Sequence, residues 1–324
     1  MINDADLAAV VMRANLAPSV HNTQPTRWRR DGDDIVLAAD LSLFLPVGDP
    51  LGMDAGLSCG AAVEATVLAL GDVGLSAEAQ DLWPNDDRTT WAGHRMVARL
   101  RLQAGKADPL ANQLAARFTW RAAFTADVPR LFGWSRADSL MVMDRPTRGW
   151  LAQRNDDVSL EIMRGSAFRS ELTHWMRFSE RHKRYAYDGL GFEAMQMDQK
   201  TATSAKWALG PLWRLFDLFG ATKGMTAEVD ATMSAPLILC FHRPVDESPV
   251  KTGRAYLRMW LSATSIGLAG WPMAALSDHP DTRAEICERF GIGTDRRLVQ
   301  VIRFGNAGAA IPPRARRPIE EILL

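Results

Sequence analysis

The stretch GAAVEATVLALGDVGL at residues 60–75 has a counterpart later in the chain, GRAYLRMWLSATSIGL at residues 253–268. Each stretch begins with glycine, places small residues on one face of a predicted helix, and ends in Gly-Leu. A helix face without bulky side chains allows another backbone to approach closely. The pair predicts two related halves within one chain. A chance similarity between two amphipathic helices is the alternative.

The composition is that of an ordinary globular protein with balanced charge. The chain has 324 residues, with 38 Lys plus Arg and 38 Asp plus Glu, so its formal net charge is zero. This length suggests roughly two domains. A neutral chain has no overall field to recruit nucleic acid or an anionic membrane. We therefore expect no nucleic-acid partner, and we expect no membrane span because no run approaches ~20 apolar residues.

Cysteine usage and the N-terminus are typical of a cytoplasmic protein. The three cysteines, Cys59, Cys240 and Cys287, lie far apart and show no CxxC or Cys/His ligand spacing. This pattern indicates reduced thiols rather than a disulfide framework or a metal site. The N-terminal segment MINDADLAAV lacks the basic and long apolar regions of a signal peptide. We expect a cytoplasmic location and no bound metal.

Hydrophobic spacing predicts a mixture of helices and strands, which is an α+β fold. Helices are predicted over 4–17, 58–70 and 253–267, and strands over 35–39, 96–102, 236–241 and 297–304. The segment 158–230, including 177–190, is helical in pattern but rich in Arg and aromatic residues. Pro211 should bend or break the run at 206–220. Two alternatives stay open: the aromatic spacing also fits an ordinary core, and the 206–220 run could lie on a membrane surface.

Two arginine clusters are the strongest chemical signals. In RFTWRAAF at 117–124, Arg117, Thr119 and Arg121 alternate, and in RARRP at 314–318, Arg314 and Arg316 do the same. Alternating residues share one face of an extended segment. Guanidinium groups bind phosphate through charge-assisted, bidentate hydrogen bonds. The clusters therefore predict a phosphate site, with two solvated basic patches as the alternative reading.

The sequence contains none of the common catalytic motifs. There is no GxSxG, HExxH or P-loop, and no GxGxxG follows a predicted strand. The six histidines are scattered, and only His21 lies in a motif of interest, the loop PSVHNTQP at 18–25. We therefore predict no catalytic side chain.

Four motifs together resemble those of the nitroreductase-like FMN flavoprotein superfamily. PSVHNTQP resembles its PSxxNxQP loop, and RFTWR resembles its RxSxR phosphate motif, with Thr119 at the serine position. GLAGWPMAAL at 267–276 resembles the segment that passes the flavin N5, and RARRP resembles the C-terminal basic pair. The chain is most similar to the Acg-type, FMN-sequestering branch, which shares DPxG at 49–52 and SCGAA at 58–62.

The resemblance implies a nitroreductase-like fold that is duplicated within the chain. In simple family members the RxSxR motif precedes PSxxNxQP, and FMN lies between two identical subunits. Here the order is reversed, and each half carries only one of the two motifs. We therefore expect a first, degenerate half over 1–115 and a second half over 116–324, with a helical lid inserted at about 158–230. Such a chain would mimic the family's homodimer as a monomer.

The resemblance also assigns the cofactor site residue by residue. The FMN phosphate would contact Arg117, Thr119, Arg121, Arg314 and Arg316, with Arg317 as an addition. The ring and ribityl chain would contact Pro18, Ser19, Val20 and Asn22, and the backbone of Ala274 and Ala275 would lie near N5. Two departures are that Ala274 stands where the family often has Glu, and that QPTRW replaces QPW, which displaces Trp28.

Three functional hypotheses follow from the resemblance. The first is an oxidoreductase that takes hydride from NAD(P)H and passes electrons to a nitroaromatic or quinone-like acceptor, with the chemistry carried by the flavin. The second is a protein that sequesters FMN beneath a closed lid, with little turnover. In the third, the site has decayed and binds no flavin.

Overall fold

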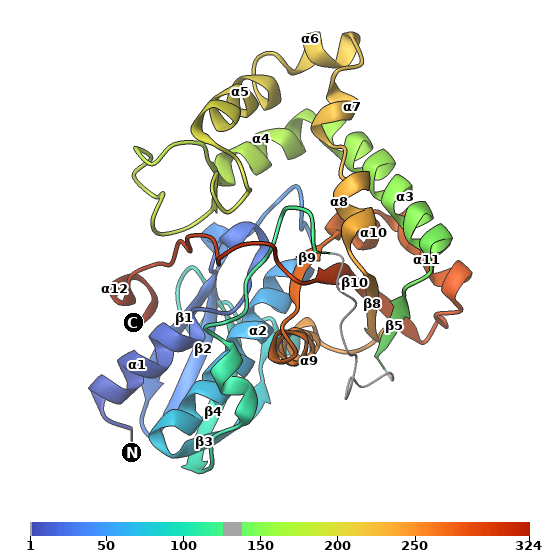
Figure 1. Ribbon diagram of the computed structural model, residues 1–324. Coiled ribbons are helices and arrows are strands. Elements are labelled where there is room, and N and C mark those ends of the chain that lie inside the picture. The colour runs from blue at the N-terminus through green and yellow to red at the C-terminus, as the bar shows by residue number, and fades with distance from the viewer. Residues whose placement is uncertain (1, 126–137) are drawn as a thin grey trace.

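The computed structural model describes residues 2–125 and 138–324, and two antiparallel sheets organise it (Figure 1). The first sheet has the order β1-β2-β4-β3, and the second has the order β5-β8-β10-β9. The strands of the first sheet are β1 (Thr26–Asp31), β2 (Asp34–Asp40), β3 (Leu75–Asp81) and β4 (His94–Ala104). Those of the second are β5 (Ser139–Val142), β8 (Leu237–Pro244), β9 (Ala269–Pro272) and β10 (Arg296–Gly305).

The two sheets share their connectivity as well as their strand order. In each half, a long helix lies between the second and third of these strands in the sequence: α2 (Met53–Leu70) in the first and α9 (Pro249–Ser265) in the second. In each sheet, the pairing between the second and fourth of these strands also shifts register at one point. The shift lies at Leu37/Ala38 in the first sheet and at Leu298/Gln300 in the second.

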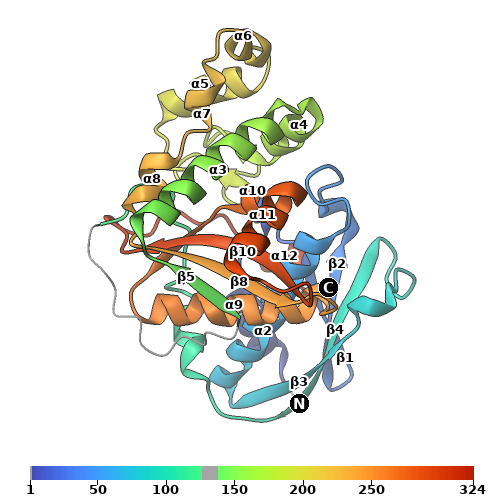
Figure 2. The same ribbon diagram turned by 90° about the vertical axis from the view of Figure 1, so that its right-hand side faces the viewer.

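The faces of α2 and α9 that were predicted to carry small residues pack directly against each other. A Cβ atom added to Gly60 would lie 2.2 Å from the Val250 carbonyl oxygen. One added to Gly253 would lie 2.1 Å from the carbonyl oxygen of Leu57. Both distances are far below van der Waals contact, so only glycine permits this approach. Figure 2 shows the two helices together at the centre of the molecule.

Helix α9 joins the cores of both halves. Its Val250, Leu257 and Leu261 are buried with residues of the first sheet and of α1 (Asp4–Ala14). Its Tyr256 and Trp260 are buried with residues of the second sheet. Helix α2 is long and apolar enough to cross a membrane by length and composition alone, yet most of it is buried in this core.

The strands and helices predicted outside 158–230 are present, with bounds shifted by a few residues, but β1 and β9 were not predicted, and neither was β3. Its sequence LSAEAQD is partly exposed along its whole length and contains no β-branched or aromatic residue. The segment is extended because it pairs with β4 throughout.

The helical prediction for 158–230 needs two corrections. The first helix, α3 (Arg145–Arg164), begins before the predicted segment, and residues 177–190 are not helical but form turns between two short strands. Tertiary ion pairing holds these turns, since Arg177 lies 2.6 Å from the buried carboxylate of Asp188. Pro211 separates α5 from α6, as predicted. The remaining elements here are α4 (Ser166–Trp175), β6 (Met176–Arg177), β7 (Leu190–Gly191), α5 (Gln199–Leu209), α6 (Trp213–Leu218), α7 (Thr222–Met225) and α8 (Val229–Ser234).

The C-terminal segment returns to the first half of the chain. After α10 (Ala274–Asp278), α11 (Pro280–Phe290) and β10, the chain crosses to α12 (Ile319–Ile322), which packs against β1. The backbone N–H of Leu324 donates to the Trp28 carbonyl at 2.8 Å. This crossing carries the second arginine cluster past the loop at 18–25.

Candidate functional site

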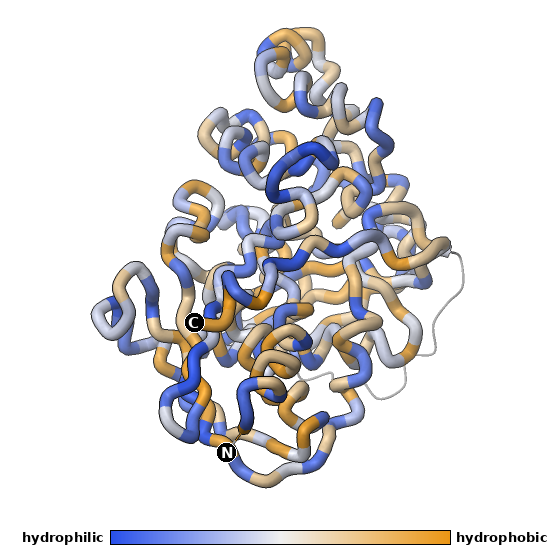
Figure 3. The backbone as a smooth tube through the Cα atoms, turned by 90° about the vertical axis from the view of Figure 1, so that its left-hand side faces the viewer, coloured by the Kyte–Doolittle hydropathy of each residue, from blue (hydrophilic) through white to orange (hydrophobic). Residues whose placement is uncertain are grey.

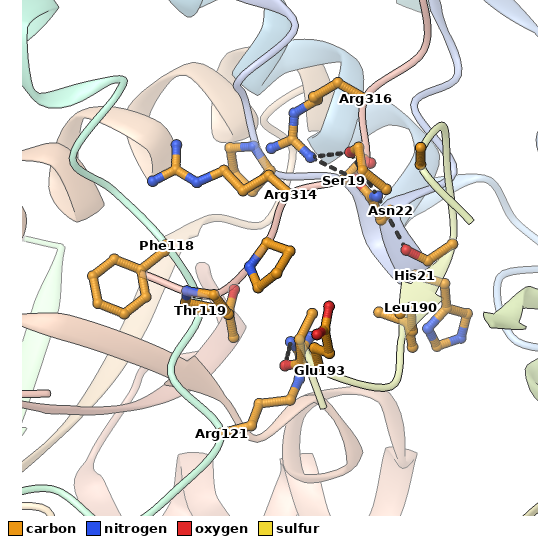
Figure 4. A pocket seen from close by; sticks show the side chains of 18 of the residues that line it. Ser19, His21, Asn22, Phe118, Thr119, Arg121, Leu190, Glu193, Arg314 and Arg316 are labelled. Carbon is orange, nitrogen blue, oxygen red and sulfur yellow. Dashed lines mark hydrogen bonds between the residues drawn. The ribbon is translucent and has the colours of Figure 1, made fainter. Parts of the chain in front are cut away.

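Two adjoining cavities lie between the loop at 18–25, the segment 117–121 and the segment 158–230, which was predicted to form a lid and which we call the lid segment. Figure 4 shows the first of them. Their volumes are about 310 Å³ and 270 Å³. They share the lining residues Pro18, Ser19, His21, Thr119, Arg121 and Leu190. The first cavity also contains Asn22, Arg117, Arg314 and Arg316, and the second contains Val20, Tyr256, Trp260, Trp271 and Ala274. Together they have the size of a site for a small organic ligand.

The loop at 18–25 adopts an unusual backbone conformation. His21, Asn22 and Gln24 have φ values of 45°, 55° and 51°, a region that costs energy for residues other than glycine. Side chains hold the loop in place: Ser58 Oγ accepts from the Val20 N–H at 3.0 Å, and Ser19 Oγ accepts from the Gln24 N–H at 3.0 Å. Such strain is characteristic of functional sites.

Asn22 connects three separate parts of the chain. Its Nδ2 donates to the carbonyl oxygens of Gly189 in the lid segment and Ala315 in the C-terminal segment, both at 3.1 Å. Its Oδ1 accepts from Arg316 at 3.0 Å. The Asn22 side chain therefore positions the rim of the first cavity.

Four of the predicted arginines line the first cavity, and carbonyl oxygens orient their guanidinium groups. Arg117 donates to Leu16 at 2.9 Å, Arg314 to Ala115 at 2.7 Å, and Arg121 to Ala194 at 3.1 Å. Arg316 shares the Leu16 carbonyl oxygen with Arg117, at 3.2 Å. The alternating residues Arg117, Thr119 and Arg121 thus reach one cavity from a single extended segment.

In this group of four arginines, which we call the cationic cluster, Arg117 is buried and the other three are partly buried. Within residues 2–125 and 138–324, none of Arg117, Arg121, Arg314 and Arg316 forms an ion pair with a carboxylate. Burial and the positive charges of Arg316 and Arg314 lower the pKa of Arg117 to about 9. Burial and the positive charge of Arg314 lower the pKa of Arg316 to about 10. At neutral pH the cluster is still charged, and a bound anion would compensate it.

The structure does not bring Arg317 into this cluster. Arg317 lies 2.6 Å from Asp188 and 3.1 Å from Glu321, and it lines neither cavity. Because adjacent residues of an extended chain point to opposite sides, Arg317 faces away when Arg316 faces the cavity. It joins Arg177 and Arg184 around the buried Asp188 and so fastens the lid segment to the C-terminal segment.

The second cavity has aromatic walls and Ala274 at one side. Tyr256 and Trp260 are in edge-to-face contact, with ring centroids 5.6 Å apart. The guanidinium group of the fully buried Arg303 lies 3.7 Å from the ring centroid of Trp271. Ala275, the neighbour of Ala274, does not line either cavity and packs instead on an apolar cluster of the second half. A flat apolar ligand fits these walls.

Several lining residues were not predicted as site residues from the sequence. The lid segment contributes Tyr185, Leu190, Glu193 and Met195, and the Tyr185 hydroxyl donates to Glu193 at 2.8 Å. No spacing in 185–195 signals this role, because the turns depend on distant ion pairs. His21 lines both cavities, and burial and Arg121 lower its pKa to about 4, so it is neutral at pH 7.

The described residues offer no cluster of three or more His, Cys, Asp or Glu side chains that could hold a metal ion. Cys59 and Cys240 are buried free thiols, and Cys287 is a partly exposed one.

The whole chain is similar to curated relatives from Mycobacterium tuberculosis. It is 25% identical over 326 residues to the protein named "Putative NAD(P)H nitroreductase Rv3131", covering 99% of this chain and 92% of the relative. It is 24% identical over 341 residues to "Putative NAD(P)H nitroreductase acg", covering 99% and 96%. No family model matches. These matches cover nearly the whole chain, which is therefore similar along its length to proteins named as nitroreductases.

Solved structures show weaker similarity. A protein from Anabaena variabilis described as a "putative nitroreductase" has a TM-score of 0.45 and 10% identity, covering 95% of this chain and 90% of that one. The FMN-dependent nitroreductase NfnB from Mycobacterium smegmatis, solved with NADPH, has a TM-score of 0.34 and 18% identity, covering 61% and 86%.

Proposed function

We propose that this chain binds one FMN across the two cavities, with its phosphate on the cationic cluster. The observation that carries the proposal is that four arginines, one buried and three partly buried, line one cavity without an ion-pair partner among the described residues. A phosphate supplies the negative charge and the acceptor oxygens that this cluster lacks. Thr119 lines both cavities and would add a neutral donor.

The aromatic second cavity suits an isoalloxazine ring. Trp260 and Trp271 offer apolar walls, while Pro18, Ser19 and Val20 approach from the loop of the first half. FMN would supply the redox chemistry, namely hydride acceptance at N5. The protein would bind and orient the ring, and Ala274, which lines the second cavity, would contact it. No side chain of the described chain is assigned a catalytic step.

The activity we propose is transfer of electrons from NAD(P)H to a nitroaromatic or quinone-like acceptor. The names of the full-length relatives support this activity. The second candidate is FMN sequestration, which is favoured by the lid segment: Leu190 lines both cavities, and Tyr185 and Met195 add further walls. A segment that encloses the ligand limits access for a second substrate.

We also propose that residues 1–115 and 116–324 are the halves of an internal duplication, with the lid at about 158–230. Supporting this proposal are the equal strand order, the equally placed helices and the single register shift in each sheet. A duplicated chain encloses the cofactor between its own halves and is active as a monomer.

An anaerobic titration separates the candidate functions. The protein is saturated with FMN, freed of excess flavin, and treated with NADPH or NADH while the flavin absorbance is recorded. In a reductase, the nucleotide reduces the flavin and the flavin absorbance falls within seconds. The absorbance returns when a nitroaromatic or quinone is added. A sequestering protein keeps its colour with either nucleotide and bleaches only with dithionite. If the protein retained no flavin, both proposals would be contradicted.

A further inference from the structure

Helices α5, α6 and α7 present an apolar face to solvent. Leu218 and Phe219 are 79% and 75% exposed. Apolar side chains this exposed are common singly, but a group of them marks an interaction surface. The group, which we call the apical face, consists of Trp207, Leu212, Leu215, Leu218, Phe219 and Met225.

Contacts on the inner side of α6 fix the orientation of the apical face. Trp213 on α6 is buried and packs with Leu160 and Met163 of α3. The guanidinium group of Arg169 lies 4.5 Å from the ring centroid of Trp213. Trp213 anchors the inner side of α6, and Leu215 and Leu218 of the same helix are 51% and 79% exposed. The exposure is therefore a property of the folded helix.

Basic residues accompany the apical face on the same helices. Lys200, Lys206, Arg214 and Lys223 are exposed on α5 to α7. The single acidic residue of these helices, Asp217, is engaged with Arg164 at 3.3 Å and with Thr222 at 2.9 Å. The whole chain is neutral, so this local excess of cations is a distinct feature of the segment.

The apical face lies at one extremity of the molecule. Figures 1 and 2 place α6 at the end remote from α1, and Figure 3 shows hydrophobic and hydrophilic residues interspersed along this end. The helices are short, and the break at Gly210–Pro211 prevents a continuous span. Tryptophan, leucine and phenylalanine flanked by Lys and Arg are typical of segments that lie in the headgroup region of a bilayer.

We propose that the apical face docks on the surface of a membrane that contains anionic lipids. Leu218 and Phe219 enter the boundary of the acyl chains, and Lys206, Arg214 and Lys223 contact the headgroups. A second copy of the chain fits the same face less well. In a two-fold contact each basic side chain would meet the same basic patch on the other copy, which costs energy.

Vesicle flotation with the full chain tests the proposal. The probes are phosphatidylcholine vesicles with and without phosphatidylglycerol, at low and high salt. Wild-type protein is expected to float with the anionic vesicles at low salt, and added salt should reduce the bound fraction. The double substitution Leu218→Asp and Phe219→Asp should weaken binding at least about tenfold, since it removes two apolar side chains and adds two negative charges.

The matched control is Met12→Asp on α1, an exposed apolar position at the other end of the molecule. It should bind as the wild type does. Thermal melts and light scattering establish that every variant is folded and report its oligomeric state. Absence of wild-type binding to anionic vesicles, or equal binding by the double variant, would overturn the proposal. A wild-type dimer that the double variant converts to monomer would also overturn it, in favour of self-association.

Discussion

Replacing Arg117 and Arg316 together with glutamine is expected to weaken FMN binding by about 10²–10⁴-fold. Each guanidinium–phosphate hydrogen bond contributes about 1.5–3 kcal/mol, so two lost contacts correspond to about 3–6 kcal/mol. Riboflavin lacks the phosphate, so its affinity should be nearly equal for wild type and variant. Fluorescence titration with both ligands measures the difference directly. This contrast separates loss of a phosphate contact from general damage to the cavity.

The stability of the ligand-free variant provides a second readout. In the wild type, burial and the charges of Arg316 and Arg314 disfavour the charged form of Arg117, and burial and Arg314 disfavour that of Arg316. Removing these two charges offsets the lost hydrogen bonds to the Leu16 carbonyl and to Asn22 Oδ1. The free energy of unfolding should therefore stay within about 1 kcal/mol of the wild-type value. Arg101→Gln, at an exposed position on β4, is the matched control and should change neither affinity nor stability. Unchanged FMN affinity in the double variant would show that the cationic cluster is not the phosphate site.

The second large effect is expected from Gly253→Ala. An added methyl group would lie 2.1 Å from the Leu57 carbonyl oxygen and 2.9 Å from the Cα of Gly60. Both obstacles are backbone atoms of α2, so rotamer changes cannot relieve the contact, and the helices must separate. Overpacking of this kind costs about 3 kcal/mol. Urea denaturation should show the midpoint falling by the corresponding amount, and FMN affinity should fall because the two halves frame the cavities.

Gly149→Ala is the matched control for this substitution. Gly149 lies inside α3, and the nearest atom to an added Cβ, the Met233 Sδ, is 3.9 Å away. Alanine is a better helix former than glycine, so this variant should gain up to about 1 kcal/mol. If Gly253→Ala were as stable as the wild type, the close α2–α9 contact described here would be wrong.

The cationic cluster shows what short-range sequence patterns can predict. Alternation in 117–121 and 314–316 grouped Arg117, Arg121, Arg314 and Arg316, and these four line the same cavity, because alternate residues of an extended chain point to the same side. The same rule, applied strictly, would have excluded Arg317, which points to Asp188 instead. The close packing of α2 against α9 was likewise predicted from the helix faces that contain Gly60 and Gly253.

Features that depend on distant partners could not be predicted from local patterns. The turns at 177–190 are stabilised by Asp188, whose carboxylate meets Arg177 and Arg184 of the same segment and the distant Arg317 of the C-terminal segment. Strand β3 is extended only because β4 pairs with it. The lid residues that line the cavities follow from these tertiary contacts, and nothing in their own spacing indicates a site.

The central claim is that a single chain holds one FMN between its own two halves. Equilibrium dialysis against FMN, with the mass of the complex measured by light scattering in the same buffer, tests it most directly. The account predicts one FMN per chain of 35.8 kDa, bound by a monomer. FMN bound only by a dimer, at a stoichiometry other than one per chain, or not at all, would contradict it.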